Sequence, residues 1–375
     1  MGKIYTALGL MSGTSGDGVD ASIICSDGID QYSEITNKYF KYDQKICENL
    51  HKLRGKILNF SDLKKNKNEI DNLEREITLF HAQIINKLLV LVDTNIDFIG
   101  FHGQTIYHNA SEKISKQIGD GNLLSQLTKK TVIYNFRQND IKNGGEGAPL
   151  APIFHRLIVK EKKLKLPICI LNIGGIANVT AISEYNGNTF LSRDLGPGNC
   201  LIDEWIRNNT KEKFDYNGEI AKKGKTNQLI LNQALNNFDY KPHQKTISFD
   251  LKDFSIGFVR GLSLEDGAAT LTDFTGTIIY SELLSFLSEK KNRLWKILVC
   301  GGGRKNITLI KKIKDMSIKN LVIQPIDDYG IDGDYVESQA FAYLAIRSFL
   351  KLPITFPSTT GCKEPTNGGI IVKNF

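Results

Sequence analysis

Three glycine-rich turns hold the residues whose types and spacing best suit chemistry in this chain of 375 residues. The turns are Ser12–Gly18, Gly174–Asn178 and Gly301–Asn306, and each follows a short apolar run. Glycine lets a backbone approach a ligand closely, and N–H groups aimed inward from such turns bind phosphates. None of the turns matches GxxxxGK(S/T), and no GxGxxG follows a strand and opens a helix, which disfavours P-loop and dinucleotide sites. We therefore expect backbone loops that share one phosphorylated ligand.

Polar residues follow two further apolar runs. Gln104 and Thr105 come soon after Ile96–Phe101, and Arg137 comes directly after Thr131–Phe136. Polar residues at the strand ends of parallel sheets tend to face the crevice where ligands bind. We expect these three side chains to face such a crevice.

Two similar hairpins position the first two glycine turns. Ile4–Leu10 and Val19–Cys25 are β-prone runs on either side of the first turn, and Pro167–Ile173 and Val179–Ile182 flank the second. Because one hairpin lies near the start of each half of the chain, the pattern indicates duplicated lobes. Together with the strand before the third turn, it points to two similar lobes that close on ATP.

The remaining segments alternate between helix and strand. Glu69–Val92 carries apolar residues at steps of three and four, which is typical of an amphipathic helix, whereas residues 27–68 look polar and irregular. The alternation predicts an α/β fold with a largely parallel central sheet. The other expected elements are strands at Phe190–Arg193 and Lys296–Cys300 and helices at Leu201–Arg207, Ala268–Phe286 and Val336–Phe349.

Glycine and proline mark the expected boundary between the lobes. Asn143–Pro152 contains three glycines and two prolines, which favours a hinge there. We expect residues 1–145 plus 340–375 to form an N-terminal lobe and residues 146–339 to form a C-terminal lobe. Pro357–Phe375 is expected to return to the first lobe as a strand or turn.

Composition excludes several classes of protein. Lys and Arg number 48 against 41 Asp and Glu, and the net charge of +7 is spread along the chain, so we expect no nucleic-acid partner. The six cysteines form no CxxC pair, which fits reduced thiols in a cytoplasmic protein. The N-terminal apolar stretch breaks at glycine and serine, and no window reaches about 18 apolar residues, so we expect neither export nor membrane spanning.

The first glycine turn carries a family resemblance. Gly9–Asp20 (GLMSGTSGDGVD) resembles the GLMSGTSMDGVD signature of the anhydro-N-acetylmuramic acid kinases, a branch of the superfamily of sugar kinases, heat-shock proteins and actin. The resemblance implies two similar lobes of the actin-like ATPase fold, which is ribonuclease H-like, with nucleotide and sugar in a cleft between them. Further matching segments, in the family's order, are Gly100–Thr105, Asn135–Arg137, Gly144–Pro152, Asn172–Asn178, Asp194–Asn199, Thr270–Thr272, Cys300–Asn306 and Glu337–Ala345.

Three residues depart from the family's pattern. Gly16 stands where methionine is usual, Glu146 where glutamine is usual, and Leu195 where threonine is usual. We expect Gly16 to loosen the first loop without removing a backbone donor. If Glu146 faces an anionic substrate, its charge weakens binding at neutral pH. Leu195 lacks a hydroxyl group whose role does not follow from the residues.

The resemblance implies a specific reaction, in which 1,6-anhydro-N-acetylmuramic acid, ATP and water become N-acetylmuramic acid 6-phosphate and ADP. Water must open the internal bridge while the released 6-oxygen accepts the γ-phosphoryl group, so a carboxylate must take the water's proton. We expect Asp194 to be that base. Arg193 could keep it ionised, although neighbours in a strand point to opposite faces. The alternative for Asp194 is a helix N-cap for the segment that begins near Asn199.

ATP and Mg²⁺ are the cofactors that the resemblance implies. The phosphates would lie against the first hairpin loop and the second glycine turn, with the adenosine end near the third loop. Asp17 and Asp20 either accept hydrogen bonds within their own turn or help to hold Mg²⁺ through water. The expected nucleotide-binding residues are Gly13, Thr14, Ser15, Gly16, Asp17, Gly18, Val19, Asp20, Gly174, Gly175, Gly301, Gly302 and Gly303.

The expected partner is a small-molecule amino sugar. Gln104 and Thr105 offer amide and hydroxyl groups for its hydroxyls or its N-acetyl oxygen, and Arg137 suits the lactyl carboxylate. Glu337 either binds the sugar or is a surface acid in the first turn of a helix. For His102 we prefer a hydrogen-bonded position packed behind the loop.

Two other functions compete with this kinase. One is a catalytically degenerate switch that binds ATP and moves, and the other is a kinase of another sugar. Asp194 together with the sugar-side polar residues favours the enzyme. Closure of two lobes is expected in each case, and a homodimer stays open as the assembly.

Overall fold

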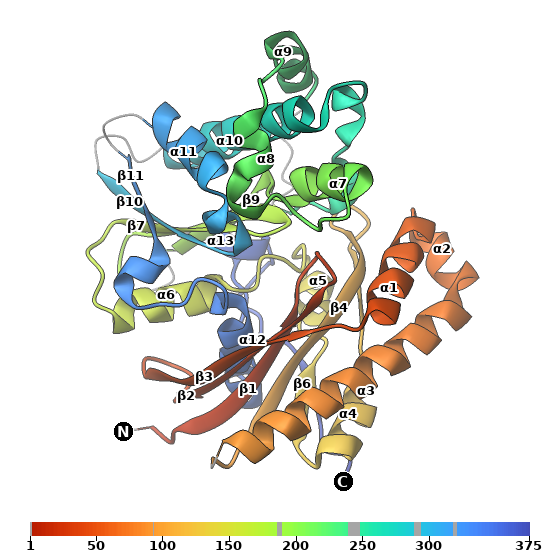
Figure 1. Cartoon of the computed structure of the whole chain (residues 1–375). Helices are drawn as coiled ribbons and strands as arrows, with labels where there is room; N and C mark the ends of the chain where they lie inside the picture. The colour runs from red at the N-terminus through yellow and green to blue at the C-terminus, as the bar shows by residue number, and fades with distance from the viewer. Residues whose placement is uncertain (1, 93, 186–189, 239–247, 289–293, 318–320) are drawn as a thin grey trace. The chain divides into compact units, whose positions relative to one another are not determined.

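The computed structural model describes residues 2–92, 94–185, 190–238, 248–288, 294–317 and 321–375 (Figure 1). The chain divides into two compact units, of which the first comprises Met1–Leu164, Tyr185–Phe190 and Tyr335–Phe375. The second comprises Lys165–Glu184 and Leu191–Asp334. The first unit therefore extends to residue 164, beyond the expected boundary at 145, and the expected hinge segment lies within it.

A mixed sheet forms the centre of the first unit. Its strand order is β3-β2-β1-β4-β6-β12, and β5 pairs with β4. The pairs β1–β4 and β4–β6 are parallel, whereas β1–β2 and β2–β3 are antiparallel because tight connections join these strands in sequence. The strands are β1 (Tyr5–Ser12), β2 (Gly18–Ser26), β3 (Tyr32–Lys41), β4 (Phe98–Asn109), β5 (Ile114–Ile118), β6 (Thr131–Tyr134) and β12 (Ile370–Val372).

Helices cover both faces of this sheet. They are α1 (Gln44–Lys56), α2 (Phe60–Lys65), α3 (Lys67–Leu91), α4 (Gly121–Thr128), α5 (Gln138–Lys142), α6 (Pro152–Glu161), α12 (Val336–Phe349) and α13 (Pro357–Thr360). Leu8 and Ile23 share a core with α1 and α3, whereas Gly9 faces α12. A Cβ atom at Gly9 would lie 1.9 Å from the carbonyl oxygen of Ser338, so the close approach of α12 requires glycine there.

Residues 27–68 contain more regular structure than the sequence predicts. They hold β3, α1 and α2. β3 is an edge strand whose side chains are mostly exposed, so it lacks the apolar alternation by which strands are recognised. The prediction of an irregular segment was therefore wrong, because an edge strand buries too little to leave a pattern.

The sheet of the second unit repeats the strand order of the first. Its order is β9-β8-β7-β10-β11, with β7–β8 antiparallel and β7–β10 and β10–β11 parallel. If β5, which pairs with β4 beside this path, is left aside, the run β3-β2-β1-β4-β6 of the first unit corresponds strand by strand to β9-β8-β7-β10-β11. This correspondence confirms two similar α/β lobes, although each sheet is mixed rather than largely parallel. The strands are β7 (Ile168–Ile173), β8 (Ile176–Ile182), β9 (Phe190–Pro197), β10 (Trp295–Cys300) and β11 (Leu321–Pro325).

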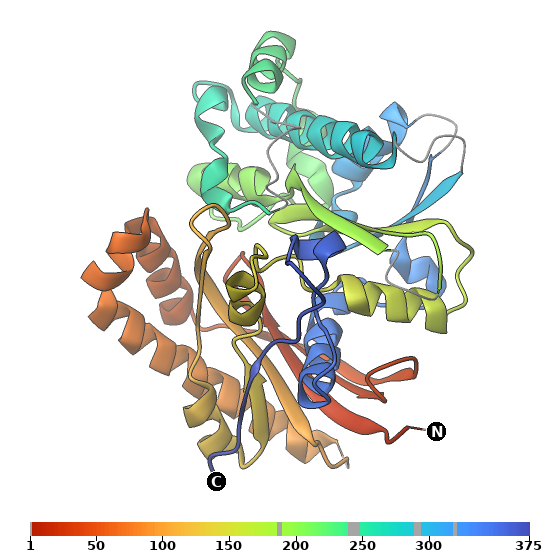
Figure 2. The ribbon, with the colours of Figure 1, turned by 180° about the vertical axis from the view of Figure 1, so that it is seen from behind.

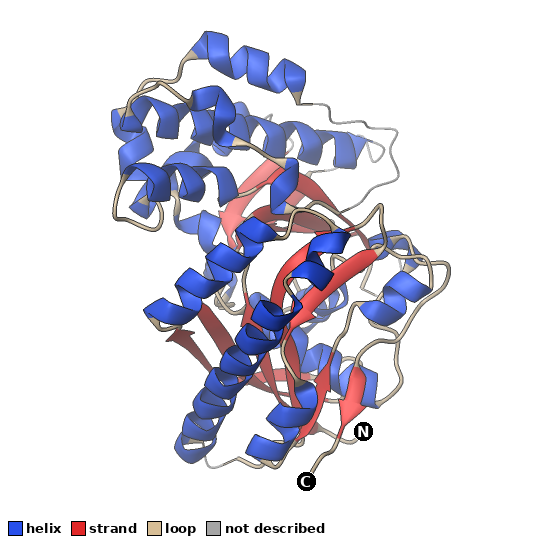
Figure 3. Ribbon diagram, turned by 90° about the vertical axis from the view of Figure 1, so that its right-hand side faces the viewer, coloured by secondary structure: helices blue, strands red, loops and turns tan. Residues whose placement is uncertain are grey.

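Helices of the second unit form two apolar clusters. They are α7 (Cys200–Asn209), α8 (Glu219–Lys223), α9 (Gln228–Asn237), α10 (Leu264–Ser288) and α11 (Ile307–Met316). Side chains of α10 and α11 pack on β7, β8 and β10, and α10 also joins α7, α8 and α9 in a second cluster. Leu195 is fully buried in the first cluster, so the position where threonine is usual is filled here by an apolar side chain. Figure 3 shows the helices of each unit around its strands.

The C-terminal segment returns to the first unit, as predicted. β12 pairs antiparallel with β6, with Ile371 opposite Ile133. Figure 2 shows this segment in blue beside the yellow strand β6. The pairing extends the sheet by one strand beyond the order that the two units share.

Candidate active site

The first glycine turn joins β1 to β2 as a compact loop in the first unit. Gly16 donates its N–H to the carbonyl oxygen of Gly13 at 3.2 Å, and its φ of +67° lies in the left-handed region that favours glycine. Ser15 is exposed and Thr14 is half-buried. Within the part of the chain that the structure describes, the amides of Thr14 and Ser15 donate no hydrogen bond. Two adjacent backbone donors are therefore open to an anion.

Two side chains hold the carbonyl oxygens of this loop. Arg54 of α1 donates Nη1 to the carbonyl oxygen of Thr14 at 2.6 Å, and Nε and Nη2 to that of Thr105 at 3.1 and 2.7 Å. Gln104 donates Nε2 to the carbonyl oxygen of Gly13 at 2.9 Å. No sequence motif predicts Arg54. Its one signal is that it is the only arginine within residues 27–68, a segment rich in lysine.

A buried polar chain lies beneath the start of the loop. Ser12 Oγ lies 2.9 Å from Tyr42 Oη and 3.3 Å from His81 Nε2, and His81 Nδ1 lies 2.8 Å from the carbonyl oxygen of Ile77. Burial lowers the pKa of His81 to about 4, so its ring is neutral at neutral pH. The neutral ring donates Nδ1–H to Ile77 and accepts from Ser12, which orients the residue that leads into the loop.

Asp17 makes contacts of the kind expected within its own turn. Its carboxylate accepts a hydrogen bond from the hydroxyl of Ser15, and its carbonyl oxygen accepts from the Tyr42 N–H at 2.9 Å and the Tyr39 hydroxyl at 3.1 Å. Asp20 lies within β2, opposite Met11 of β1. Among the described residues, no group of three or more His, Cys, Asp or Glu side chains could hold a metal ion.

Gln104 and Thr105 lie within β4 rather than after a strand. The prediction of a strand end at Phe101 was wrong because β4 continues as a hairpin with β5 beyond its parallel pairing with β1. Gln104 is fully buried, and its Oε1 has no hydrogen-bond partner among the described residues. Thr105 Oγ1 accepts a hydrogen bond from Gln117 Nε2 at 3.1 Å.

Arg137 follows β6, as predicted, and contacts His102. Its Nη1 donates to the carbonyl oxygen of Gly147 at 2.7 Å, and its Nη2 donates to His102 Nε2 at 3.0 Å. His102 Nδ1 donates to the carbonyl oxygen of Gly103 at 2.8 Å. Burial, together with the nearby charge of Arg137, holds the pKa of His102 well below its usual value. The hydrogen-bonded, buried position preferred for His102 is confirmed.

Asp140 orders the segment that carries Glu146. Its Oδ2 accepts from the Gly147 N–H at 2.7 Å, and its Oδ1 accepts from the Thr360 hydroxyl at 2.6 Å. The Glu146 N–H donates to the carbonyl oxygen of Thr360 at 2.9 Å, and the side chain of Glu146 is half-buried. This segment is therefore tied to α13 rather than free to act as a hinge.

Glu337 stands in the first turn of α12 and is half-buried. The neighbouring Ser338 Oγ lies 2.6 Å from Ser22 Oγ of β2 and donates to the carbonyl oxygen of Tyr335 at 3.0 Å. This position is expected whether Glu337 is a sugar ligand or a surface acid in the first turn of a helix. Its role stays a prediction.

Two glycine-rich segments of the second unit meet at the end of β7. The N–H groups of Gly198 and Asn199 donate to the carbonyl oxygens of Gly175 and Gly174 at 2.9 and 2.8 Å. A Cβ atom at Gly198 would lie 2.3 Å from the carbonyl oxygen of Gly174, so this contact requires glycine. The fold thus joins the second glycine turn to the segment that follows Asp194.

The third glycine turn packs against the same strand end. A Cβ atom at Gly301 would lie 2.3 Å from Asn172 Oδ1, and one at Gly303 would lie 2.2 Å from Ile173 Cγ2. Gly302 faces Asn199, whose Nδ2 would lie 4.0 Å from such an atom. Three predicted segments of the second unit, at Gly174–Gly175, Asp194–Asn199 and Gly301–Gly303, are therefore brought together.

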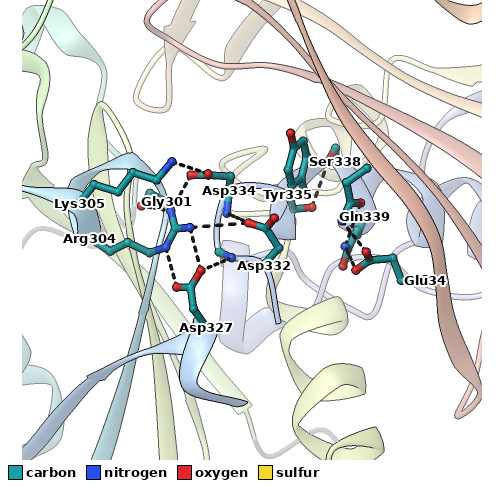
Figure 4. A network of polar contacts seen from close by, with 12 residues as sticks. Glu34, Gly301, Arg304, Lys305, Asp327, Asp332, Asp334, Tyr335, Ser338 and Gln339 are labelled. Atoms are coloured by element: carbon teal, nitrogen blue, oxygen red, sulfur yellow. Dashed lines mark hydrogen bonds and ion pairs between the residues drawn. The ribbon is translucent and has the colours of Figure 1, made fainter. Parts of the chain in front are cut away.

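Arg304 fixes the third turn to the loop that follows β11 (Figure 4). Its Nη1 donates to the carbonyl oxygen of Gly301 at 3.1 Å and to Asp334 at 2.6 Å, and its Nε donates to Asp327 at 2.7 Å. Its Nη2 lies 3.6 Å from Asp332. The guanidinium is 7% exposed, and its hydrogen bonds and charge help to hold the pKa values of Asp327 and Asp334 below their usual range. Sequence patterns include Arg304 in a matching segment but assign it no role.

Asp194 lies within β9 and is 7% exposed. Its Oδ2 accepts a hydrogen bond from the Phe249 N–H at 2.8 Å. The predicted strand end at Arg193 was wrong, since β9 continues to Pro197, and the N-cap of α7 is Asn199, which excludes the capping role for Asp194. Arg193 Nη2 lies 3.1 Å from the side-chain carboxylate of Glu282, and its effect on the pKa of Asp194 stays a prediction.

Each unit of the described structure contains a cavity. The cavity of the first unit, about 920 Å³, is lined mainly by β5, α5 and neighbouring segments and includes none of the predicted site residues. The cavity of the second unit, about 340 Å³, is lined in part by Ile307, Thr308 and Lys311, which follow the third glycine turn. No helix in the described part of the chain has the length and apolar character needed to cross a bilayer.

Known proteins match nearly the whole chain. The family model for anhydro-N-acetylmuramic acid kinase matches residues 5–374. The anhydro-N-acetylmuramic acid kinase of Pelagibacter ubique (strain HTCC1062) is 56% identical over 375 residues, which cover 100% of each chain. That of Zymomonas mobilis subsp. mobilis is 40% identical, covering 97% of this chain and 99% of the other. A solved structure, component A of (R)-2-hydroxyglutaryl-CoA dehydratase from Acidaminococcus fermentans, is 11% identical, covers 92% of this chain and 100% of its own, and has a TM-score of 0.42. From the family model and the two kinase sequences, this chain belongs to the anhydro-N-acetylmuramic acid kinase family.

Proposed function

We propose that this protein is a kinase that opens 1,6-anhydro-N-acetylmuramic acid with water and transfers the γ-phosphoryl group of ATP to the released 6-oxygen. One observation carries this proposal. In the second unit, the segment that follows the buried Asp194 packs against two glycine turns. A carboxylate and phosphate-binding backbone on one rigid framework are what the reaction needs. Family membership names the substrate.

Asp194 is the proposed general base. Water attacks the anomeric carbon and loses a proton to the carboxylate, while the bond from that carbon to the 6-oxygen breaks. The released oxygen attacks the γ-phosphorus, whose bond to the β–γ bridging oxygen breaks, and ADP leaves. The Phe249 N–H donates to Oδ2 of Asp194 at 2.8 Å, which helps to fix the direction of the carboxylate. A base on a strand keeps a fixed direction, which favours proton transfer from one position of the water.

The nucleotide is proposed to bind through main-chain donors. The amides of Thr14 and Ser15 fit phosphate oxygens because their N–H groups have no other acceptor among the described residues. Gly174–Gly175 would supply a second backbone contact. The adenosine end would lie beyond Gly301–Gly303, where the 340 Å³ cavity beside Ile307 and Thr308 offers a hollow.

Mg²⁺ would accompany ATP and neutralise phosphate charge when bound. Asp17 and Asp20 are proposed to help hold it through water. Asp17 already accepts a hydrogen bond from Ser15, which ties its carboxylate to the phosphate loop.

The amino sugar is proposed to contact the first unit. Gln104 Oε1 is a buried acceptor without a partner among the described residues, which suits a sugar hydroxyl or an amide N–H. Thr105 and Glu337 would add polar contacts. Arg137, held by Gly147 and His102, would face the lactyl carboxylate, and the neutral ring of His102 adds no competing charge. Since ATP is a cytoplasmic metabolite, we place the reaction in the cytoplasm.

The test is a product assay with a matched carboxylate variant. Protein, ATP and the anhydro sugar are incubated in water labelled with oxygen-18, and mass spectrometry follows the 6-phosphate. The label should enter at the anomeric oxygen. Asp194→Asn should lower kcat at least about a hundredfold while ATP still binds, because only the proton acceptor is lost.

Asp315→Asn is the control for Asp194→Asn. Asp315 is an exposed carboxylate on α11 of the same unit, so its loss changes the charge without touching β9. The control should keep the rate of the unaltered protein. ATP binding without phosphorylation of this sugar or of related anhydro and free sugars would contradict the proposal and favour a switch.

A further inference from the structure

We propose that Arg54 is a positioning residue for the first phosphate loop, holding it so that its amides face the phosphates of ATP. The inference rests on the proposed function, because it assigns a role within the same nucleotide site. Arg54 lies on α1, outside every predicted site segment, and would act through the loop rather than by touching the substrate.

The contacts of Arg54 join three elements. From α1 it reaches the carbonyl oxygen of Thr14 in the loop at 2.6 Å, and with two further N–H groups it holds the carbonyl oxygen of Thr105 in β4. A guanidinium is planar and always charged, so its donors form charge-assisted hydrogen bonds in fixed directions. Arg54 therefore ties the loop to the strand that carries Gln104 and Thr105.

Peptide geometry converts this contact into an orientation of the donors. A trans peptide is planar, so the C=O of one residue and the N–H of the next point in opposite directions. Because Arg54 holds the C=O of Thr14, the N–H of Ser15 points away from Arg54. Gln104 holds the C=O of Gly13 in the same way, which turns the N–H of Thr14 away from Gln104. The amides that follow the two held carbonyls, those of Thr14 and Ser15, donate to no other described group.

Gly16 makes room for this arrangement. A Cβ atom at Gly16 would lie 3.2 Å from Arg54 Nη1 and 2.6 Å from Leu50 Cδ2. The space that a side chain at position 16 would occupy is thus taken by Arg54 and Leu50. Glycine at this position, where the family usually has methionine, therefore accompanies an arginine clamp beneath the loop in this chain.

The experiment measures ATP binding directly in the full-length protein. Calorimetry with a non-hydrolysable ATP analogue gives Kd without requiring the sugar, and the coupled assay gives the KM for ATP and kcat separately. Arg54→Met should raise Kd and KM about tenfold or more, with a smaller change in kcat. Arg54→Lys should restore part of the affinity, since an ammonium keeps the charge but lacks the rigid, planar arrangement of donors that a guanidinium offers.

Lys56→Met is the matched control. Lys56 is on the same helix and is exposed, and its ammonium binds Glu69 rather than the loop. This variant also removes one positive charge from α1, but it breaks no contact with the loop. It should therefore leave Kd for the analogue unchanged. An equal rise of Kd in Lys56→Met and Arg54→Met would overturn the inference, because it would reveal a general charge effect.

A double-mutant cycle checks that Gly16 and Arg54 act together. Gly16→Ala should also raise Kd, and in Arg54→Met the same substitution should have less effect, since the clamp it disturbs is already lost. Additive effects would instead reveal independent strain at a φ of +67° and overturn the pairing. Thermal unfolding without nucleotide identifies any variant that fails to fold. If Arg54→Met does not fold, the values of Kd for Arg54→Lys and Gly16→Ala test the role of Arg54.

Failure of this inference is distinguishable from failure of the proposed function. If the unaltered protein binds the analogue and Arg54→Met binds it equally well, the role of Arg54 is wrong while the kinase stands. If the unaltered protein binds the analogue and Arg54→Met weakens binding without sugar turnover in either, the positioning role holds and the kinase proposal is wrong. If the unaltered protein does not bind the analogue, both are wrong.

Discussion

Three residues differ from those usual in the family, and the side chains around each of them indicate its effect. Leu195 lies in the apolar core, where a hydroxyl would need a partner. Gly16 is buried against Leu50 and Arg54, so the loop is held from below rather than simply loosened. Glu146 is the departure for which we predict an effect on substrate binding, because it adds a negative charge to an ordered segment.

Glu146→Gln should lower the KM for the sugar about threefold to tenfold at neutral pH. If Glu146 faces the lactyl carboxylate, removal of its charge relieves a repulsion of about 1 kcal/mol. The main-chain bond from Glu146 to Thr360 is unaffected by this substitution. Steady-state kinetics with the anhydro sugar provide the measurement.

The control for this substitution is the corresponding anhydro sugar without the lactyl group. Its kinetics should be the same for the unaltered protein and for the Glu146→Gln variant, since no anion faces position 146. An equal change for both sugars would mean that the substitution alters the segment rather than the charge. No change for either would place Glu146 away from the substrate.

At the scale of elements, the loop after β10 depends on one arginine. Arg304 is almost buried and joins Gly301 to Asp327 and Asp334, whereas these carboxylates are 42% and 32% exposed. Without the guanidinium, neighbouring carboxylates repel one another and the carbonyl oxygen of Gly301 loses its donor from Arg304. The Gly301 N–H then remains hydrogen-bonded to the carbonyl oxygen of Gly333 at 2.9 Å. The turn and the loop after β11 therefore behave as one element.

Arg304→Met should lower the free energy of unfolding of the second unit by about 1–3 kcal/mol and raise the KM for ATP. Urea unfolding followed by tryptophan fluorescence reports this unit, because the two tryptophans, Trp205 and Trp295, both lie in it. Lys305→Met is the control, since Lys305 is 59% exposed and binds only the rim carboxylate of Asp334. If both variants lose a comparable amount of unfolding free energy, Arg304 does not stabilise the second unit more than an exposed lysine does.

At the scale of the whole molecule, the buried histidines that the structure describes lie in the first unit. Burial lowers the pKa of His81 to about 4 and the pKa values of His108 and His155 to about 3, and it holds that of His102 well below its usual value. The described part of the second unit contains no histidine. The two units should therefore respond differently to acid.

The free energy of unfolding of the first unit should fall as the pH drops from about 6.5 towards 4. In that range the unfolded chain binds protons at histidines that stay neutral in the folded unit, and each such proton contributes about 1.4 kcal/mol per pH unit. The stabilisation is complete above the unfolded pKa of about 6.5. Hydrogen exchange of peptides from α3 and β4, measured in urea at several pH values, reports the first unit.

Substitution of one buried histidine should reduce the slope of the unfolding free energy against pH by the contribution of one proton. His155→Gln should reduce the pH slope by about one proton, because burial is the cause of the lowered pKa of His155. Equal acid sensitivity of tryptophan fluorescence and of the α3 peptides would contradict the assignment of this effect to the first unit.

Local features of the sequence were sufficient to predict a large part of the fold. The 25-residue helix α3 was predicted to within two residues at each end, because its apolar face repeats along neighbouring turns. Both hairpins were predicted from β-prone runs that flank glycine. β3 and the true ends of β4 and β9 were not, because strand length depends on which neighbour remains to pair with.

What the sequence by itself determined is the chemistry available: glycine turns that can offer backbone amides, and a carboxylate at position 194. Only the tertiary structure decided how these groups are held. Arg54 and Thr14 are 40 residues apart, Gln104 and Gly13 are 91 apart, and Asp194 and Phe249 are 55 apart. Such contacts follow from sheet order and helix packing, which no spacing of neighbouring residues encodes. The physical reason is that a glycine's freedom is a local property, whereas the direction of an amide depends on which distant donor holds the carbonyl before it.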